Sequence, residues 1–111
     1  TINISTMKSA ILSDPRFEKG KQLFADNCSS CHALVHVDGP SLAGVEERVP
    51  DKKLLYSWIR NSEAVLKSGD AYFTNLYNEY NKTAMQSFPA LTDEDIDAIL
   101  FYIKVEGSGS F

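Results

Sequence analysis

The two cysteines of the chain, Cys28 and Cys31, are separated by two residues, and His32 follows the second directly. Thiol and imidazole groups at this spacing suit three kinds of chemistry: a zinc site, a redox-active dithiol, or a group attached through both sulfur atoms. Each of these chemistries requires different surroundings. The residues around the motif therefore have to discriminate among them.

A zinc site would need four ligands in a tetrahedron, and the soft candidates are Cys28, Cys31, His32 and His36. The side chains of consecutive residues diverge, and the spacer of roughly 12 residues that usually divides a Cys/His zinc site is missing. A redox dithiol needs a helix that begins at the cysteine, whereas here a predicted helix precedes it. A disulfide across two residues would close a loop too small to add much stability.

Covalent haem attachment uses all three side chains, because two thiols at this spacing can each add to a haem vinyl group while the adjacent histidine binds the iron. A second axial ligand would complete the site. The chain has two methionines, Met7 near its start and Met85 in the segment KTAMQSFPALT before a predicted helix. Met85 is the better placed, although filling a gap in the core is the commoner role of a methionine.

Four segments have the apolar spacing of helices. The first begins at Asp14 and Pro15, which suit an N-cap and a first helical position, and it ends near Asn27. Its apolar face consists of Phe17, Gly20, Leu23 and Phe24. The others are predicted over residues 51–61, 70–80 and 92–105, with Asp51 and Thr92 as caps of the first and last. Since no strand-hairpin pattern is present, the predicted fold is all-α.

Size and charge restrict the classes of function. The 111 residues predict one domain over 13–106, with an N-terminal arm or linker over 1–12 and a flexible tail over 107–111. A net charge of −4 disfavours nucleic acid as a partner, and no apolar run approaches the roughly 20 residues of a membrane span. The chain begins with Thr1, so we expect any export signal to have been removed or left out.

In these residues the chain resembles the class I c-type cytochromes of bacterial type, from Asp14 to Val105. The matching motifs, in order, are Gly20 and Phe24 before the haem site, Cys28, Cys31 and His32 as C-x-x-C-H, Gly39, Pro40, Leu42 and Gly44 as G-P-x-L-x-G, and Met85, Phe88 and Pro89 as M-x-x-F-P. The resemblance implies a small fold of about four helices around one haem c bound through both cysteines. It also implies that Gly20 and Phe24 meet Ile99 and Tyr102 where the first and last helices cross.

The resemblance further implies a role for each site residue. His32 and Met85 would be the axial iron ligands, and His32 would donate its second ring N–H to the Pro40 carbonyl. Leu42 would contribute to the haem-binding loop, and Arg48 would contact a haem propionate unless it is a solvated surface charge. Trp58 would face the methionine side of the haem, although its apolar stripe also predicts a core residue.

The implied function is one-electron transfer, as a soluble carrier or as the cytochrome domain of a larger respiratory complex, and not catalysis. The partners would be a redox donor and acceptor, with the protein periplasmic or on the extracytoplasmic face of the inner membrane, free or tethered to a membrane complex. The alternatives are a haem enzyme or gas sensor with a labile Met85, and a zinc-bound interaction module. The tyrosine-rich insertion over 68–82 would cover the haem edge or dock a partner.

Overall fold

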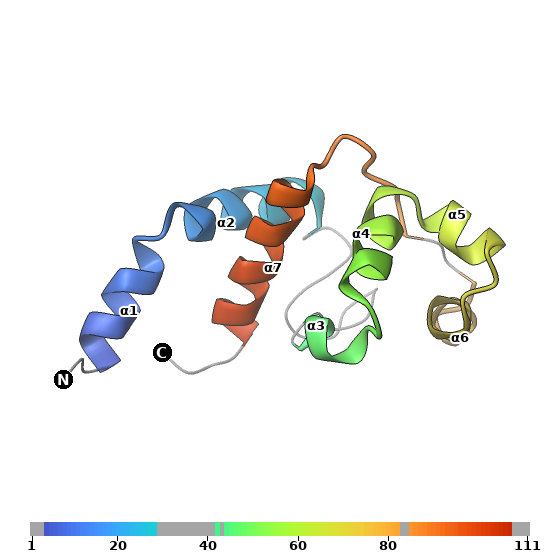
Figure 1. The fold of residues 1–111 in the computed structure, drawn as a ribbon, viewed down its shortest axis with the longest axis horizontal. Helices are drawn as coiled ribbons and strands as arrows, with labels where there is room; N and C mark the ends of the chain where they lie inside the picture. Colours follow the sequence, from blue (N-terminus) through green and yellow to red (C-terminus); the bar gives the residue numbers. More distant parts are fainter. Residues whose placement is uncertain (1–3, 29–41, 43, 83–84, 108–111) are drawn as a thin grey trace. The chain divides into compact units, whose positions relative to one another are not determined.

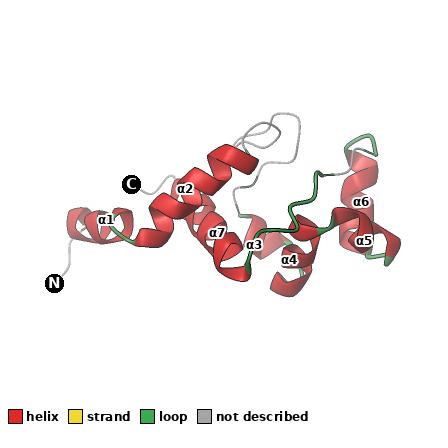
Figure 2. Ribbon diagram, turned by 90° about the horizontal axis from the view of Figure 1, so that it is seen from above, coloured by secondary structure: helices red, strands yellow, loops and turns green. Residues whose placement is uncertain are grey.

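The computed structural model describes residues 4–28, 42, 44–82 and 85–107, and over these residues it contains seven helices and no strand (Figure 2). They group into two compact units, one formed by residues 1–44 and 94–111 and the other by residues 45–93. The first unit holds α1 (Ile4–Leu12), α2 (Pro15–Asn27) and nearly all of α7 (Asp93–Gly107), and the second holds α3 (Val45–Arg48), α4 (Lys52–Arg60), α5 (Ser62–Lys67) and α6 (Ala71–Glu79) (Figure 1). None of the described helices has both the length and the apolar character needed to cross a membrane.

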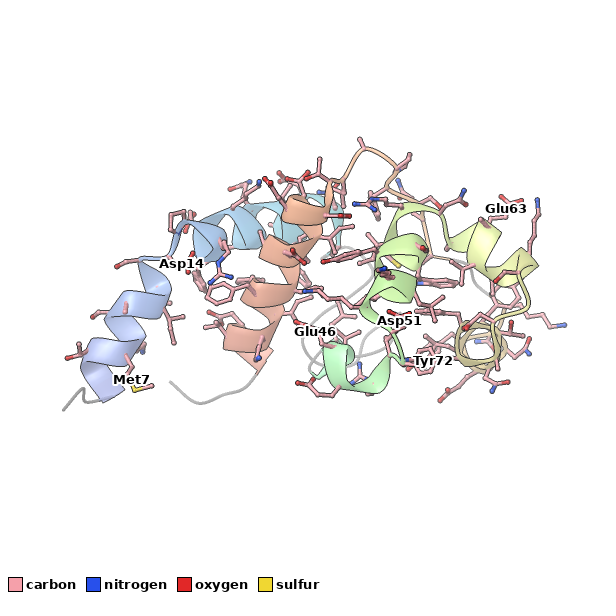
Figure 3. All side chains as sticks on the ribbon, viewed as in Figure 1. Met7, Asp14, Glu46, Asp51, Glu63 and Tyr72 are labelled. Atoms are coloured by element: carbon pink, nitrogen blue, oxygen red, sulfur yellow. The ribbon has the colours of Figure 1, made fainter. Side chains whose placement is uncertain are left out.

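The predicted start of α2 is confirmed. The Asp14 carboxylate accepts a hydrogen bond of 2.9 Å from the Arg16 backbone N–H, and Pro15 occupies the first helical position. The Arg16 guanidinium also binds this carboxylate at 2.8 Å, and its hydrogen bond lowers the pKa of Asp14. Figure 3 labels Asp14 at this junction between α1 and α2. Because the cap and the proline both act on the local backbone, they could be identified from the sequence.

Aspartates also cap the second and third predicted helices. Asp51 accepts from the backbone N–H of Lys53 at 2.9 Å at the start of α4, and Asp70 accepts from that of Phe73 at 2.8 Å at the start of α6. The last predicted helix is α7, which begins after Thr92 as expected and continues two residues beyond the predicted end at Val105. All four predicted helices are therefore present.

Three further helices, α1, α3 and α5, were not predicted. The predicted arm over 1–12 is helical from Ile4 to Leu12. Met7 of this helix, labelled in Figure 3, is 48% exposed, and Leu12 is 43% exposed. Helices α3 and α5 have only four and six residues, which is too short for an apolar periodicity to be recognised. The fold is all-α as predicted, with more helices than the expected four.

The core of the first unit forms where α2 crosses α7. A Cβ atom on Gly20 would lie 1.9 Å from the Ala98 carbonyl oxygen, so only glycine permits this approach of the two backbones. On either side of Gly20, the rings of Phe17 and Phe24 lie 5.5 Å and 5.4 Å from the ring of Tyr102. The predicted contact of Gly20 and Phe24 with Tyr102 is thus confirmed, and Gly20 also approaches the Ala98 backbone. Ile99, the other predicted partner, is buried on the same helix.

Polar contacts border the same crossing. Lys19 of α2 forms a 3.0 Å ion pair with Asp95 of α7, and the Arg16 guanidinium lies 4.3 Å from the centre of the Phe101 ring. These two exposed pairs orient the helices more than they stabilise them, since surface ion pairs contribute little. At the same crossing, burial, and secondarily the charge of Glu106, raises the pKa of Tyr102.

Aromatic stacking forms the core of the second unit. The Trp58 ring of α4 lies parallel to the Phe73 ring of α6, with a centroid distance of 4.3 Å and an interplanar angle of 7°. Tyr72, labelled in Figure 3, meets the edge of Phe73 at 5.0 Å and 88°. The tyrosine-rich insertion therefore packs on α4 through Phe73, which is 2% exposed.

Candidate functional site

Cys28 lies at the C-terminal end of α2, where its backbone N–H donates to the Phe24 carbonyl at 2.8 Å. Its side chain is buried, and this burial raises the pKa of the thiol to about 11. The thiol is therefore neutral at physiological pH. A thiolate for disulfide exchange would need the opposite shift, which a helix N-terminus or a nearby cation provides.

Several predicted site residues lie outside the described part of the chain: Cys31, His32 and Pro40, together with the zinc candidate His36. Among the described residues there is no cluster of three or more His, Cys, Asp or Glu side chains able to hold a metal ion. The structure therefore describes the first and the last residue of the predicted site, Cys28 and Met85.

Met85 is half-buried, and its main chain is attached to the junction between α4 and α5. The Ser62 hydroxyl donates a 2.5 Å hydrogen bond to the Met85 carbonyl, and the Ser62 backbone N–H donates to Ser87 Oγ at 3.2 Å. Ser62 is only 2% exposed, so water does not compete for these bonds. A single buried residue thus binds the chain on both sides of Gln86.

The segment that follows is attached to the same end of α4. The Phe88 backbone N–H donates to the Ile59 carbonyl at 3.0 Å. The Arg60 Nε donates to the Leu91 carbonyl at 2.8 Å, and the same guanidinium forms an ion pair with Asp93. The stretch from residue 85 to residue 93 is consequently bound at five points to residues 59–62.

The remaining predicted site residues have distinct surroundings. Leu42 is half-buried in the first unit, and Arg48 ends α3 with its side chain exposed. Trp58 is buried in its stack with Phe73, which fits the predicted core role. The stack joins Trp58 to Phe73, which was not among the predicted site residues.

Sequence reasoning missed Ser62, Ser87 and Arg60. Their hydrogen bonds join residues 23 to 33 positions apart, and no local pattern encodes such pairs. The one available signal was Asn61, whose side chain accepts from the Ala64 backbone N–H at 3.1 Å and caps α5. An N-cap at Asn61 would have predicted that a new helix begins at this position, where only the end of a helix was expected.

The described residues fit a covalently bound haem. A thioether carries no charge, so it suits the buried position of Cys28, where a thiolate would be strongly destabilised. Met85 offers an uncharged, soft sulfur donor on a main chain that is held in place by hydrogen bonds. Neither residue would have to ionise in order to bind the group.

Comparison with known proteins agrees with this chemistry. The Cytochrome c family model matches residues 17–105. The cytochrome c6 of Cyanidioschyzon merolae is 32% identical over 87 residues, covering 78% of this chain and 71% of that protein. The Photosystem II extrinsic protein V of a Picosynechococcus strain is 24% identical over 115 aligned positions, covering 96% of this chain and 66% of that protein.

Solved structures give the same result. A cytochrome c from Rhodothermus marinus superposes with a TM-score of 0.72 at 26% identity, covering 89% of this chain and 83% of its own. The cytochrome c domain of a Pseudomonas putida protein superposes with a TM-score of 0.67 at 28% identity, covering 81% of this chain and 89% of its own.

The chain belongs to the cytochrome c family, as a class I monohaem domain. Membership carries a covalently bound haem c and haem-based electron transfer with redox partners. The resemblance inferred from the motifs is thereby confirmed at the level of family, fold and cofactor.

Proposed function

We propose that this protein is a one-electron carrier whose haem is attached through Cys28 and Cys31 and whose iron is bound by His32 and Met85. The observation that carries the proposal is the attachment of the Met85 main chain to buried Ser62. A methionine on a firmly held segment suits a permanent ligand, whereas a labile ligand needs a segment that can move away. Permanent ligation leaves no coordination site for oxygen or peroxide.

Bound haem supplies a one-electron iron couple, and a histidine–methionine ligand pair raises its reduction potential relative to two histidines. The chain's own residues would set the properties of that couple. Donation from the second ring N–H of His32 to the Pro40 carbonyl would fix the orientation and basicity of the imidazole. Burial of the Cys28 sulfur would keep that side of the site dry.

The other assignments follow the family motifs. Leu42 would line the haem-binding loop, and Arg48 would pair with a haem propionate through its exposed guanidinium. Trp58 would face the methionine side of the haem while its ring packs on Phe73. The cytochrome domain would span residues 13–106, with residues 1–12 as an arm and 107–111 as a tail.

We place the protein outside the cytoplasm, as a periplasmic carrier or as a domain of a respiratory complex. The names of two relatives, a cytochrome c6 and a Photosystem II extrinsic protein, support an extracytoplasmic or lumenal setting. Both the electron donor and the acceptor would be redox proteins. An export-dependent maturation test would check the location, because the haem should be attached only in exported protein.

Carbon monoxide binding to the reduced, matured protein tests the ligand assignment. In the wild-type protein Met85 should exclude carbon monoxide at neutral pH. Met85→Ala should bind it rapidly and completely and should lose the far-red charge-transfer band of a methionine sulfur bound to ferric iron. Met7→Ala is the matched control, because Met7 is the other methionine of the chain and is 48% exposed on α1.

Rapid, complete carbon monoxide binding by the wild-type protein would contradict the carrier and favour a gas sensor or a haem enzyme. Loss of the far-red band in Met7→Ala rather than in Met85→Ala would reassign the ligand. A matured protein without any haem spectrum in alkaline pyridine would leave the zinc-binding alternative.

A further inference from the structure

We infer that Ser62 is a positioning residue for the Met85 iron ligand, and that its hydroxyl sets how readily the methionine sulfur is displaced. The inference rests on the proposed ligation by Met85. It comes from the two hydrogen bonds that Ser62 makes to the main chain on either side of Gln86.

The hydroxyl of Ser62 has one hydrogen to donate, and it is given to the Met85 carbonyl at 2.5 Å. The backbone N–H of the same residue is one of the first N–H groups of α5, which have no partner inside the helix. Ser87 Oγ accepts from it at 3.2 Å. Ser62 therefore binds Met85 and Ser87 at once, and two points fix the direction of the segment as well as its position.

The anchor itself is rigid. Ser62 is the first residue of α5, and the preceding Asn61 caps this helix through the Ala64 N–H at 3.1 Å. The backbone N–H of Asn61 donates to the Ser57 carbonyl at 2.8 Å and thereby closes the end of α4. Two helices thus meet at Ser62, which is 2% exposed and unable to move without disturbing both.

A methionine side chain has three rotatable bonds, so its sulfur is held only as well as its backbone is held. Release of the sulfur from iron requires the Met85 segment to move. The Ser62 hydroxyl opposes this movement through a bond that water cannot replace at a buried site. Its removal should leave the ligand bond possible but easier to break.

The test uses matured, ferric protein and imidazole as a competing iron ligand. Ser62→Ala should bind imidazole about tenfold more tightly than wild type, which corresponds to ~1.4 kcal/mol for one buried hydrogen bond. The far-red methionine band should be weakened or broadened before imidazole is added. Ser87→Ala, which removes the second attachment point, should shift imidazole affinity in the same direction.

The chain offers a matched control. Ser68 also donates its hydroxyl to a backbone carbonyl, that of Val65 at 2.6 Å, and it lies at the other end of α5. Ser68→Ala should leave imidazole affinity and the far-red band unchanged. A second control, Val65→Ala, lowers stability by opening the core near α5 and removes none of the bonds that Ser62 makes.

Imidazole affinity within twofold of wild type in both Ser62→Ala and Ser87→Ala would overturn the inference. So would an equal rise in Val65→Ala at the same loss of stability, because the effect would then follow stability alone. Failure of the proposed ligation itself would look different, since the wild-type protein would lack the far-red band before any substitution is made.

Discussion

The sharpest prediction concerns Gly20, where α2 and α7 touch. In Gly20→Ala the new methyl carbon would lie 1.9 Å from the Ala98 carbonyl oxygen, 2.6 Å from the Ala98 carbonyl carbon and 2.9 Å from Tyr102 Cβ. The nearest two of these atoms are backbone, so no side-chain rotation relieves the clash. The two helices would have to separate by about 1.5 Å to reach the 3.4 Å of ordinary van der Waals contact.

The magnitude follows from three contributions. Overpacking against backbone costs about 3 kcal/mol, at the upper end of the usual range. Separation of the helices also weakens the packing of Phe17 and Phe24 on Tyr102, at a further cost of about 1 kcal/mol. Alanine recovers about 1 kcal/mol because it favours helix over glycine. We therefore expect a net loss of about 3 kcal/mol, or a fall of roughly 10–20 °C in Tm.

Denaturant unfolding of the matured protein, followed by far-ultraviolet circular dichroism, measures this loss. Gly69→Ala is the control, because a Cβ there meets nothing within 4 Å and only the backbone angle φ of +78° opposes the substitution. That control should cost about 1 kcal/mol. A loss in Gly20→Ala no greater than that in Gly69→Ala would refute the close packing of α2 on α7.

Three further predictions concern single side chains. Asp14→Asn should be less stable than wild type at neutral pH, and because Arg16 lowers the pKa of Asp14, the difference should shrink as the pH falls below about 3.8 in urea titrations. Arg60→Ala should lower the free energy of unfolding by about 2 kcal/mol through loss of its bonds to Leu91 and Asp93, and Arg60→Lys should restore less than half of it. Trp58→Ala should cost about 3–5 kcal/mol and Trp58→Phe about half as much, since a phenyl ring can still stack on Phe73; equal losses in calorimetry would argue against the stack.

The parts of the fold that the sequence predicted are those encoded locally. Asp14 and Asp51 accept hydrogen bonds from backbone N–H groups two residues away, so their capping roles could be predicted without a structure. The helix after Asp70 was predicted as well, but the cap that Asp70 provides to the Phe73 N–H was not. The contact of Gly20 with α7 was predicted from the family resemblance and not from spacing alone. Covalent attachment of haem, in contrast, was suggested by three residues that are close in the sequence, Cys28, Cys31 and His32.

The parts that were missed depend on distant pairs or on very short helices. Ser62 is an ordinary polar residue in the sequence, and its importance comes from Met85 and Ser87, which are 23 and 25 positions away. The stack of Trp58 on Phe73 likewise joins two helices that each showed only an apolar face. An amphipathic pattern predicts that a residue is buried, but it does not identify the residue against which it packs.

Mass spectrometry of the matured protein and of its proteolytic peptides tests the central claim most directly. The intact mass should equal that of the polypeptide plus one haem, and the haem should remain on the peptide that contains Cys28, Cys31 and His32. An intact mass equal to the polypeptide alone, from cells that mature other c-type cytochromes, would contradict the account.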